Sequence, residues 1–207
     1  MKKALSIIIF ISIYLNGFAQ TNDRLINQTE GQNGHVINYI TAQTLIDGRI
    51  NHTLNLKEVL NNKTLEETIR IWGEPINIKS EQDVANDGTV LFERKMGYYP
   101  GLRLIFPEKN GKYVLSRIDF ITNKSNLKLG DTSFSLGMEV DKLLPTANKI
   151  KSGEGKRDID IRVLETDHTG KIKKTDQGVF QSRSELLKIE TDSAGRIRSM
   201  SLLMYTI

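Results

Sequence analysis

The chain has 207 residues, 38% of them hydrophobic, and carries 29 Lys and Arg against 25 Asp and Glu. This composition is typical of globular proteins and excludes a disordered tail, while the length favours one domain or two small lobes that share a core. The sequence contains no cysteine. Disulfides and cysteine nucleophiles are therefore excluded, and stability must come from packing.

Residues 1–19 are predicted to form a cleaved export signal. Lys2 and Lys3 supply the positive charge, an apolar stretch runs from Ala4 to Leu15, and a small-x-small cleavage site ends at Ala19. As a helix, the apolar stretch spans only about 18 Å, less than the hydrocarbon core of a bilayer, so no stable membrane anchor is expected. The expected location is periplasmic or secreted.

Cleavage after Ala19 has two further consequences. It removes two lysines and no acidic residue, so the formal net charge falls from +4 to +2, which disfavours nucleic acid as a partner. Residues 20–34 are polar and show no periodicity, which predicts a flexible leader before the folded part begins near His35. Between His35 and Leu60 the apolar residues alternate loosely, and both helix and strand remain open.

A short amphipathic helix is predicted from Thr64 to Trp72. Thr64 and Glu67 have the spacing of a capping box, and Gly73-Glu74-Pro75 ends the helix. Strands are then predicted at Thr89–Lys95, Leu102–Phe106 and Tyr113–Ile121, with turns at Asn86-Asp87-Gly88 and Asn110-Gly111.

The second part of the chain repeats this order. Gly137–Pro145 is predicted to be a short helix that the proline ends. The strands that follow are predicted at Ile159–Leu164, Gly178–Gln181, Leu186–Thr191 and Ile197–Met204, with turns at Asp167–Gly170 and Asp192–Gly195.

The prediction is therefore an α+β fold of two repeated units, residues 35–127 and 128–207. Each unit has a short helix followed by an antiparallel β-meander. Leu102–Phe120 aligns with Leu187–Leu202, with Gly111 opposite Gly195, which suggests an internal duplication. A short helix is only marginally stable alone, and an apolar sheet face is unfavourable in water, so each half must cover one face of its sheet with its helix or with the other half. The opposite face of the sheet is then free for docking.

Two segments resemble the family of the outer-membrane assembly lipoprotein BamE and the β-lactamase inhibitor proteins. They are Leu136-Gly137-Met138-Glu139-Val140 with Leu143-Leu144, and Thr64 through Trp72-Gly73-Glu74-Pro75. The resemblance covers residues 64–205 in two copies and implies a small bacterial envelope or secreted module that binds other proteins. This chain lacks the lipid-bearing cysteine of BamE and the disulfide cysteines of the inhibitors.

Catalytic motifs are poorly represented, and no catalytic, cofactor-binding or metal-binding residue is predicted. Only His35, His52 and His168 could serve a serine triad, and no nucleophile elbow is present. Ser125-x-x-Lys128 matches the serine–lysine pattern of some hydrolases, but a match of this kind is expected by chance in a chain of this composition. The calcium-loop pattern that begins at Asp83 fails because Arg94 stands where a bidentate glutamate is needed.

One pair of carboxylates keeps a hydrolase open as a minor alternative. Asp158 and Asp160 alternate along a strand and so point to the same side. The three scattered histidines do not supply a zinc site, and neither a Walker loop nor a dinucleotide fingerprint occurs.

The local feature that remains is Met96-Gly97-Tyr98-Tyr99-Pro100-Gly101, which is flanked by Arg94, Lys95 and Arg103. Tyrosine offers a large rigid contact area with a polar tip and is enriched among interface anchors. We therefore predict a protein-contact site at Tyr98, Tyr99, Met96, Arg94 and Arg103. A connecting loop whose tyrosines fold back over the sheet is the alternative.

These features predict an exported, non-catalytic protein-binding module that needs no cofactor. Its partner would be another protein in the envelope or outside the cell. An assembly accessory, an inhibitor and an immunity protein are not separated by the sequence. A second hypothesis is a periplasmic protein that binds a small ligand or a lipid in a cavity between sheet and helix.

Overall fold

The computed structural model describes residues 25–30, 36–60, 63–140, 158–169, 171–176 and 179–204. The predicted export signal, most of the predicted leader, and His35 lie outside these residues. The predicted helix Gly137–Pro145 is described only up to Val140.

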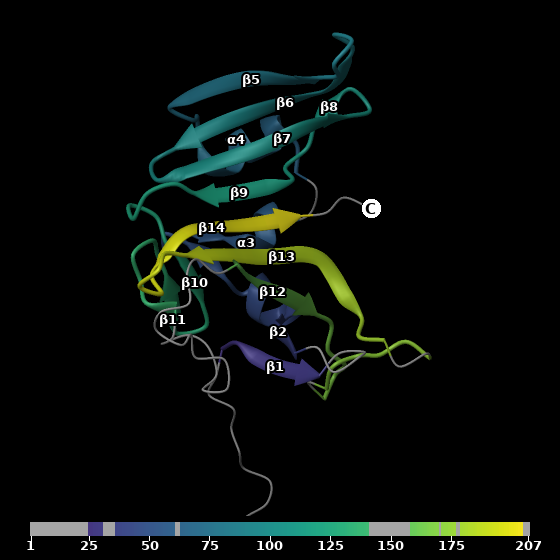
Figure 1. The fold of residues 1–207 in the computed structure, drawn as a ribbon, viewed down its shortest axis with the longest axis vertical. Coiled ribbons are helices and arrows are strands. Elements are labelled where there is room, and N and C mark those ends of the chain that lie inside the picture. Colours follow the sequence, from purple (N-terminus) through teal and green to yellow (C-terminus); the bar gives the residue numbers. More distant parts are fainter. Residues whose placement is uncertain are drawn as a thin grey trace, which may run out of the picture.

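One large twisted sheet runs through the whole described structure (Figure 1). Along the sheet, its strands are β1 (Asn27–Glu30), β2 (Val36–Thr41), β12 (Asp158–Leu164), β13 (Ser182–Thr191), β14 (Ile197–Met204), β9 (Arg117–Phe120), β7 (Leu102–Lys109), β6 (Val90–Tyr99) and β5 (Asn77–Val84), with the short β8 (Lys112–Tyr113) paired to β7 outside this path. Neighbouring strands are antiparallel, except that β12 and β2 are parallel.

A smaller four-stranded sheet and three short helices lie behind the large sheet in the view of Figure 1. The small sheet has the order β11 (Thr132–Phe134), β10 (Leu127–Leu129), β3 (Arg49–Ile50) and β4 (Leu54–Asn55), and the helices are α2 (Ala42–Ile46), α3 (Leu56–Val59) and α4 (Leu65–Trp72). The hydrophobic core joins these elements to one face of the large sheet. It includes Leu45, Leu56, Leu65, Leu104 and Leu202.

Local sequence signals explain several of these elements. In α4, Thr64 and Glu67 form the complete predicted capping box, and Gly73 ends the helix with a positive φ of 83°. In β7, Leu102, Leu104 and Phe106 are buried while the residues between them are half exposed. The predicted helix and this predicted strand are therefore confirmed.

The turn predictions are also confirmed where the structure describes them. Asn110 and Gly111 both have positive φ, as a two-residue hairpin turn requires, and they connect β7 to β8. The turn at Asn86-Asp87-Gly88 connects β5 to β6, and Asp192–Gly195 connects β13 to β14.

The predicted α+β fold of two repeated helix-plus-meander units is wrong. The structure is mostly β, and segments of the two expected halves are paired with each other. Strand β10 pairs with β3, and β2 lies parallel to β12, so both sheets draw strands from both halves. Two three-stranded meanders, β6-β7-β9 and β12-β13-β14, do occur, and their last strands pair antiparallel in the centre of the sheet.

The described start of the second predicted helix, residues 137–140, is bonded to a hairpin of the large sheet. The backbone N–H of Gly137 donates to the carbonyl of Ile197, and the N–H of Ile197 donates to the carbonyl of Met138. The N–H of Val140 donates to the carbonyl of Gly195. These bonds tie residues 137–140 to the β13–β14 hairpin.

A β-strand is also present before His35. Strand β1 lies within the segment expected to be a flexible leader, where it pairs with β2, and Ile26 is fully buried. The ambiguous segment from His35 to Leu60 contains both kinds of element, because β2 leads directly into α2 and is followed by β3, β4 and α3.

Candidate functional site

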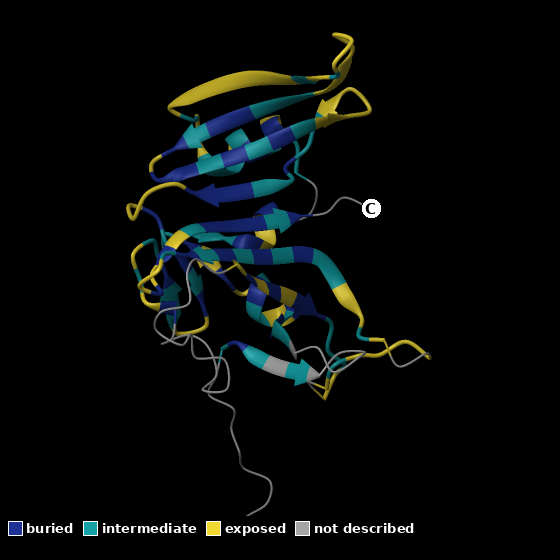
Figure 2. Ribbon diagram, viewed as in Figure 1, coloured by how far each residue is buried: buried dark blue, intermediate teal, exposed yellow. Residues whose placement is uncertain are grey.

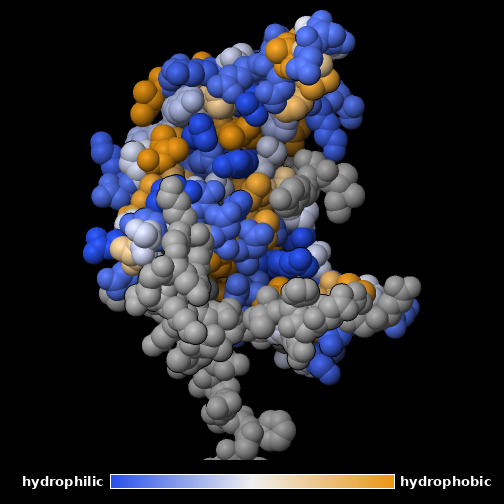
Figure 3. All heavy atoms as spheres, in the orientation of Figure 1, coloured by the Kyte–Doolittle hydropathy of each residue, from blue (hydrophilic) through white to orange (hydrophobic). Residues whose placement is uncertain are grey.

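Among the described residues, helices and the small sheet cover one face of the large sheet and leave the other face open (Figures 1 and 3). In Figure 3, hydrophilic side chains gather over the middle of this open face. Cross-strand register places Tyr98 of β6 opposite Arg103 of β7, Arg103 opposite Asp119 of β9, and Asp119 opposite Ser201 of β14. These four side chains therefore form one row across four adjacent strands.

Asp119 is the centre of this row. Its side chain is only 6% exposed. Its Oδ2 accepts hydrogen bonds from Nε (3.0 Å) and Nη2 (2.7 Å) of Arg103, and its Oδ1 accepts from Nε of Arg117 and, at 2.7 Å, from the hydroxyl of Ser201. Hydrogen bonding to Asp119 is the main cause that raises the pKa of Arg103. The buried carboxylate is thus satisfied by four donors.

The two arginines reach from the buried carboxylate to solvent. The side chains of Arg103 and Arg117 are 36% and 41% exposed, so both guanidinium groups keep donors available at the surface. Two cations share one anion, which leaves the cluster with one net positive charge. We call Tyr98, Arg103, Arg117, Asp119 and Ser201 the arginine cluster. Its fixed guanidinium groups suit the recognition of carboxylates, backbone carbonyls or aromatic faces.

Four of the five residues predicted for protein contact lie on the open face. Tyr98 and Arg103 belong to the arginine cluster, and Lys79 lies 5.6 Å from the centre of the Tyr98 ring. Arg94 lies further along β6, where it pairs with Glu81 at 2.9 Å. Met96 lies on the same face but is only 3% exposed.

Tyr99 lies on the opposite face and packs in the core. It is 8% exposed, its hydroxyl donates to the carbonyl of Gly73 at 3.0 Å, and its ring meets Trp72 edge-on with the centroids 5.7 Å apart. Burial, with a smaller contribution from Glu74, raises the pKa of Tyr99 to about 12. Tyr99 therefore holds the end of α4 against the sheet and is not exposed for contact.

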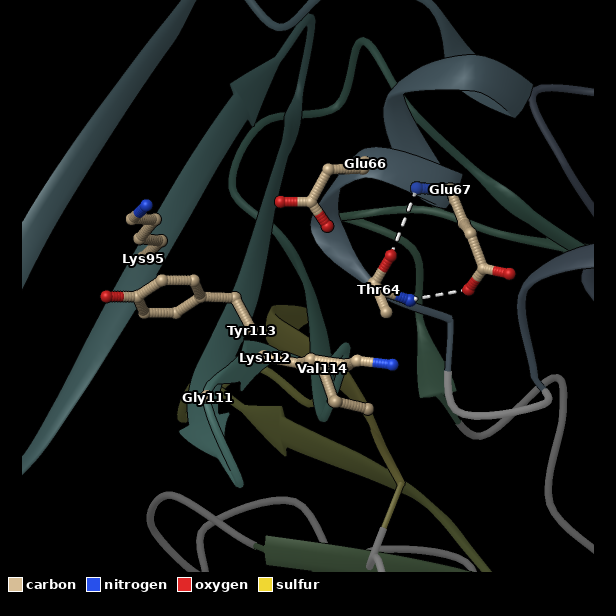
Figure 4. A pocket seen from close by; sticks show the side chains of 8 residues that line it. All are labelled: Thr64, Glu66, Glu67, Lys95, Gly111, Lys112, Tyr113 and Val114. Atoms are coloured by element: carbon tan, nitrogen blue, oxygen red, sulfur yellow. Dashed lines mark hydrogen bonds between the residues drawn. The ribbon is translucent and has the colours of Figure 1, made fainter.

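A shallow groove separates the N-terminus of α4 from the β7–β8 hairpin (Figure 4). Its volume is about 800 Å³, and it is lined by Thr64, Glu66, Glu67, Lys95, Gly111, Lys112, Tyr113 and Val114. Most of the polar groups already have partners. Glu67 accepts from the backbone N–H of Thr64 at 2.9 Å, which lowers the pKa of Glu67. The ammonium of Lys95 lies 4.0 Å from the centre of the Tyr113 ring.

The residues considered for catalysis are dispersed. His52 lies in an exposed turn with a φ of 61°, and His168 lies in another exposed turn. Ser125 is fully buried and donates to the carbonyl of Pro100 at 2.7 Å. The carboxylates of Asp158 and Asp160 lie on the exposed side of β12, and Asp158 pairs with Lys188 at 3.7 Å.

The candidate calcium loop is a hairpin turn, in which Asp87 accepts from the backbone N–H of Thr89 at 2.9 Å. Within the described ranges, no group of three or more His, Cys, Asp or Glu residues is placed to hold a metal ion. In the same part of the chain, no helix has both the length and the apolar character needed to cross a membrane.

Sequence reasoning missed Arg117, Asp119 and Ser201. The spacing of Arg117 and Asp119 was a usable signal, because residues two apart in a strand point to the same face. Ser201 gave no such signal, since it meets Asp119 only through the pairing of β14 with β9.

Comparisons with protein-family models, curated proteins and solved structures found no match for this chain. The resemblance to BamE and the β-lactamase inhibitor proteins therefore stays a prediction from sequence.

Proposed function

We propose that this protein is an exported, non-catalytic module that binds another protein through the open face of its large sheet. The observation that carries the proposal is the arginine cluster, in which buried Asp119 fixes two half-exposed guanidinium groups beside Tyr98. The partner is a protein of the envelope or of the surroundings of the cell. The role of an assembly accessory, an inhibitor or an immunity protein remains open within this class.

The energetics of association support this use of the cluster. Binding loses free energy when long side chains are immobilised, and a guanidinium already held by hydrogen bonds avoids much of that loss. Arginine and tyrosine are also the side chains most enriched among residues that dominate binding energy. In the cluster, Tyr98 and Arg103 are direct cross-strand neighbours, so they form one continuous contact patch.

The open face favours contact with a broad surface over chemistry on a small molecule. Several of the described carboxylates on it are paired with cations: Asp119 with Arg103 and Arg117, Glu81 with Arg94, Asp158 with Lys188, and Glu190 with Arg198. Such pairing occupies the carboxylate oxygens with cationic donors. A large sheet with one half-solvated face is instead a usable docking surface.

Site-specific photocrosslinking tests the proposal. A photoreactive amino acid replaces Tyr98, and in a control protein it replaces Lys57, which is exposed on α3 behind the sheet. After irradiation in an envelope extract of the source organism, the Tyr98 position should give one discrete protein adduct. An adduct that forms equally from Lys57, or no adduct from either position, would contradict the proposal.

Once the partner is isolated, its affinity measures the site directly. Tyr98→Ala and Arg103→Ala should each weaken the complex by about 1 kcal/mol or more. Arg70→Ala is the matched control, because Arg70 is exposed on α4, on the covered side of the sheet. Unchanged affinity in both cluster variants would remove the open face from the binding site.

The small-ligand hypothesis has less support from the described residues. The groove beside α4 is open, and its lining includes the charged side chains of Glu66, Glu67, Lys95 and Lys112, which is unsuited to a lipid tail. Native mass spectrometry of the purified protein distinguishes the two hypotheses, because a retained small molecule would favour a ligand-binding role.

A further inference from the structure

Strand β5 forms one edge of the large sheet and pairs on one side only, with β6, among the described strands. Seven of its eight residues are exposed, and Figure 2 shows this exposure along the whole strand. An edge strand presents backbone N–H and C=O groups that can pair with another strand. Most proteins shorten or cover such an edge, whereas β5 is long and uncovered.

Exposed hydrophobic side chains gather on the same hairpin. Of the eight large hydrophobic residues exposed in the described part of the chain, six lie between residues 76 and 92: Ile76, Ile78, Val84, Val90, Leu91 and Phe92. Ile76 is 75% exposed and Val84 is 57% exposed. Clustered apolar exposure beside an open strand edge marks an interaction surface.

We propose that the free edge of β5 pairs antiparallel with β5 of a second copy of this chain, so that the two large sheets become continuous. This inference does not depend on the proposed function, because the pairing forms at the backbone edge of β5 and does not involve the arginine cluster. Closed symmetry requires a two-fold axis perpendicular to the sheet at the pairing strands. One residue of β5 must then face its own counterpart across that axis.

The charge pattern of β5 selects the position of the axis. Centring on Lys79 or on Glu81 would place like charges directly opposite each other, which is destabilising. Centring on Ser80 places a small neutral hydroxyl against itself. In that register Lys79 faces Glu81 of the second copy, and Glu81 faces Lys79, so two attractive pairs flank the axis.

Within one copy, the charges of Lys79 and Glu81 are not fully balanced by ion pairs. Among the described residues, Arg94 is the one cation paired with Glu81 (2.9 Å) and Asp83 (3.6 Å), so these two carboxylates carry one more negative charge than Arg94 balances. Lys79 lies over the ring of Tyr98 and has no carboxylate within salt-bridge distance in the described part of the chain. Pairing β5 with β5 of the second copy places Lys79 opposite Glu81, one of these two carboxylates.

The same register also covers apolar surface. It places Ile76 opposite Val84 of the second copy at each end of the paired strands, on the face opposite Lys79 and Glu81. Backbone pairing, ion pairs and apolar contacts therefore agree on one alignment. Since two edge strands bury less than the about 1,200 Å² of a standard interface, the dimer is expected to be weak and reversible.

Analytical ultracentrifugation with charge reversal tests this inference. The purified protein should show a concentration-dependent dimer between about 10 µM and 1 mM. Lys79→Glu and Glu81→Lys each turn two attractive pairs into two repulsive pairs, so each alone should raise the dissociation constant at least about tenfold. An equimolar mixture of the two variants should form a heterodimer again, because both cross-strand pairs become attractive.

Cysteine crosslinking provides a second measurement that does not depend on charge. The chain has no cysteine, so Ser80→Cys introduces a single thiol at the axis, where opposing Cα atoms are close enough for a disulfide. Oxidation should give a covalent dimer with Ser80→Cys and little with the neighbouring Gln82→Cys. A monomeric wild-type protein, a dimer unaffected by either charge reversal, or preferential crosslinking through Gln82→Cys would overturn the proposal.

Discussion

Replacing Tyr99 with phenylalanine tests whether this tyrosine is a core residue that anchors α4. The substitution keeps the ring and its edge-on contact with Trp72, and it removes only the hydrogen bond to the carbonyl of Gly73. A neutral hydrogen bond contributes about 1 kcal/mol, so Tyr99→Phe should be less stable than the wild type by that amount at neutral pH.

At alkaline pH the order should reverse. The pKa of Tyr99 is raised from 10.0 to about 12 in the folded protein, so the unfolded chain loses this proton first as pH rises. The stabilisation of the protonated form is complete below pH 10 and is lost as pH rises through the folded pKa. Two pH units correspond to roughly 2–3 kcal/mol, which exceeds the lost hydrogen bond, so the phenylalanine variant becomes the more stable protein near pH 12.

Urea denaturation at a series of pH values measures this difference. The only tryptophan, Trp72, lies beside Tyr99 and provides the fluorescence signal. Subtracting one protein from the other at each pH cancels the contributions of the other tyrosines. A stability difference that stays constant from pH 9 to pH 12 would refute the burial of this hydroxyl, and partner affinity should be unchanged in Tyr99→Phe.

Four further substitutions test the fold. Asp119→Ala should lower the free energy of unfolding, measured by urea denaturation, by about 2–3 kcal/mol. This is less than the loss of one partner of a wholly buried ion pair, because the two arginines can be hydrated again. Gly101→Ala should cost roughly 2 kcal/mol or more in thermal unfolding, because φ is +77° and a Cβ would lie 2.7 Å from the Ser125 hydroxyl oxygen. Gly88→Ala, which has open space, should cost only about 1 kcal/mol. Thr64→Ala should lower the unfolding free energy by about 1 kcal/mol through loss of the helix cap.

The elements predicted well from sequence are those specified by nearby residues. The capping box of α4 needs only Thr64 and Glu67, three positions apart, and the turn at Asn110-Gly111 needs only residues that tolerate positive φ. Strands β7 and β14 have enough buried residues to give a clear pattern. Such signals act before any long-range contact is made, so a single sequence contains them.

The overall architecture depended on pairings that no local signal specifies. Strand β2 lies parallel to β12, which follows more than a hundred residues later, and β10 joins β3 in the small sheet. Strand β5 was not predicted because its sequence, NIKSEQDV, has no apolar alternation. An edge strand with no buried face does not need that alternation.

The contact site was partly predictable. Adjacent residues in a strand point to opposite faces, so Tyr98 and Tyr99 could not both contact the same partner once β6 was recognised as a strand. The row through Arg103, Asp119 and Ser201 needed the order of β7, β9 and β14, which joins residues 16 and 82 positions apart. The sequence pointed to Tyr98 and Arg103 but not to Asp119, the carboxylate that holds the cluster together.

The two proposed surfaces have a joint consequence. A two-fold axis perpendicular to the sheet preserves its faces, so both open faces of the dimer point to the same side. A weak contact through one arginine cluster would then be reinforced by the second whenever the partner presents two copies of its epitope on one surface. Lys79→Glu should therefore weaken binding to such a partner fixed densely on a surface more than binding to the same partner free in solution. Equal weakening in both formats would show that Lys79 contributes to the contact itself and not through pairing of β5.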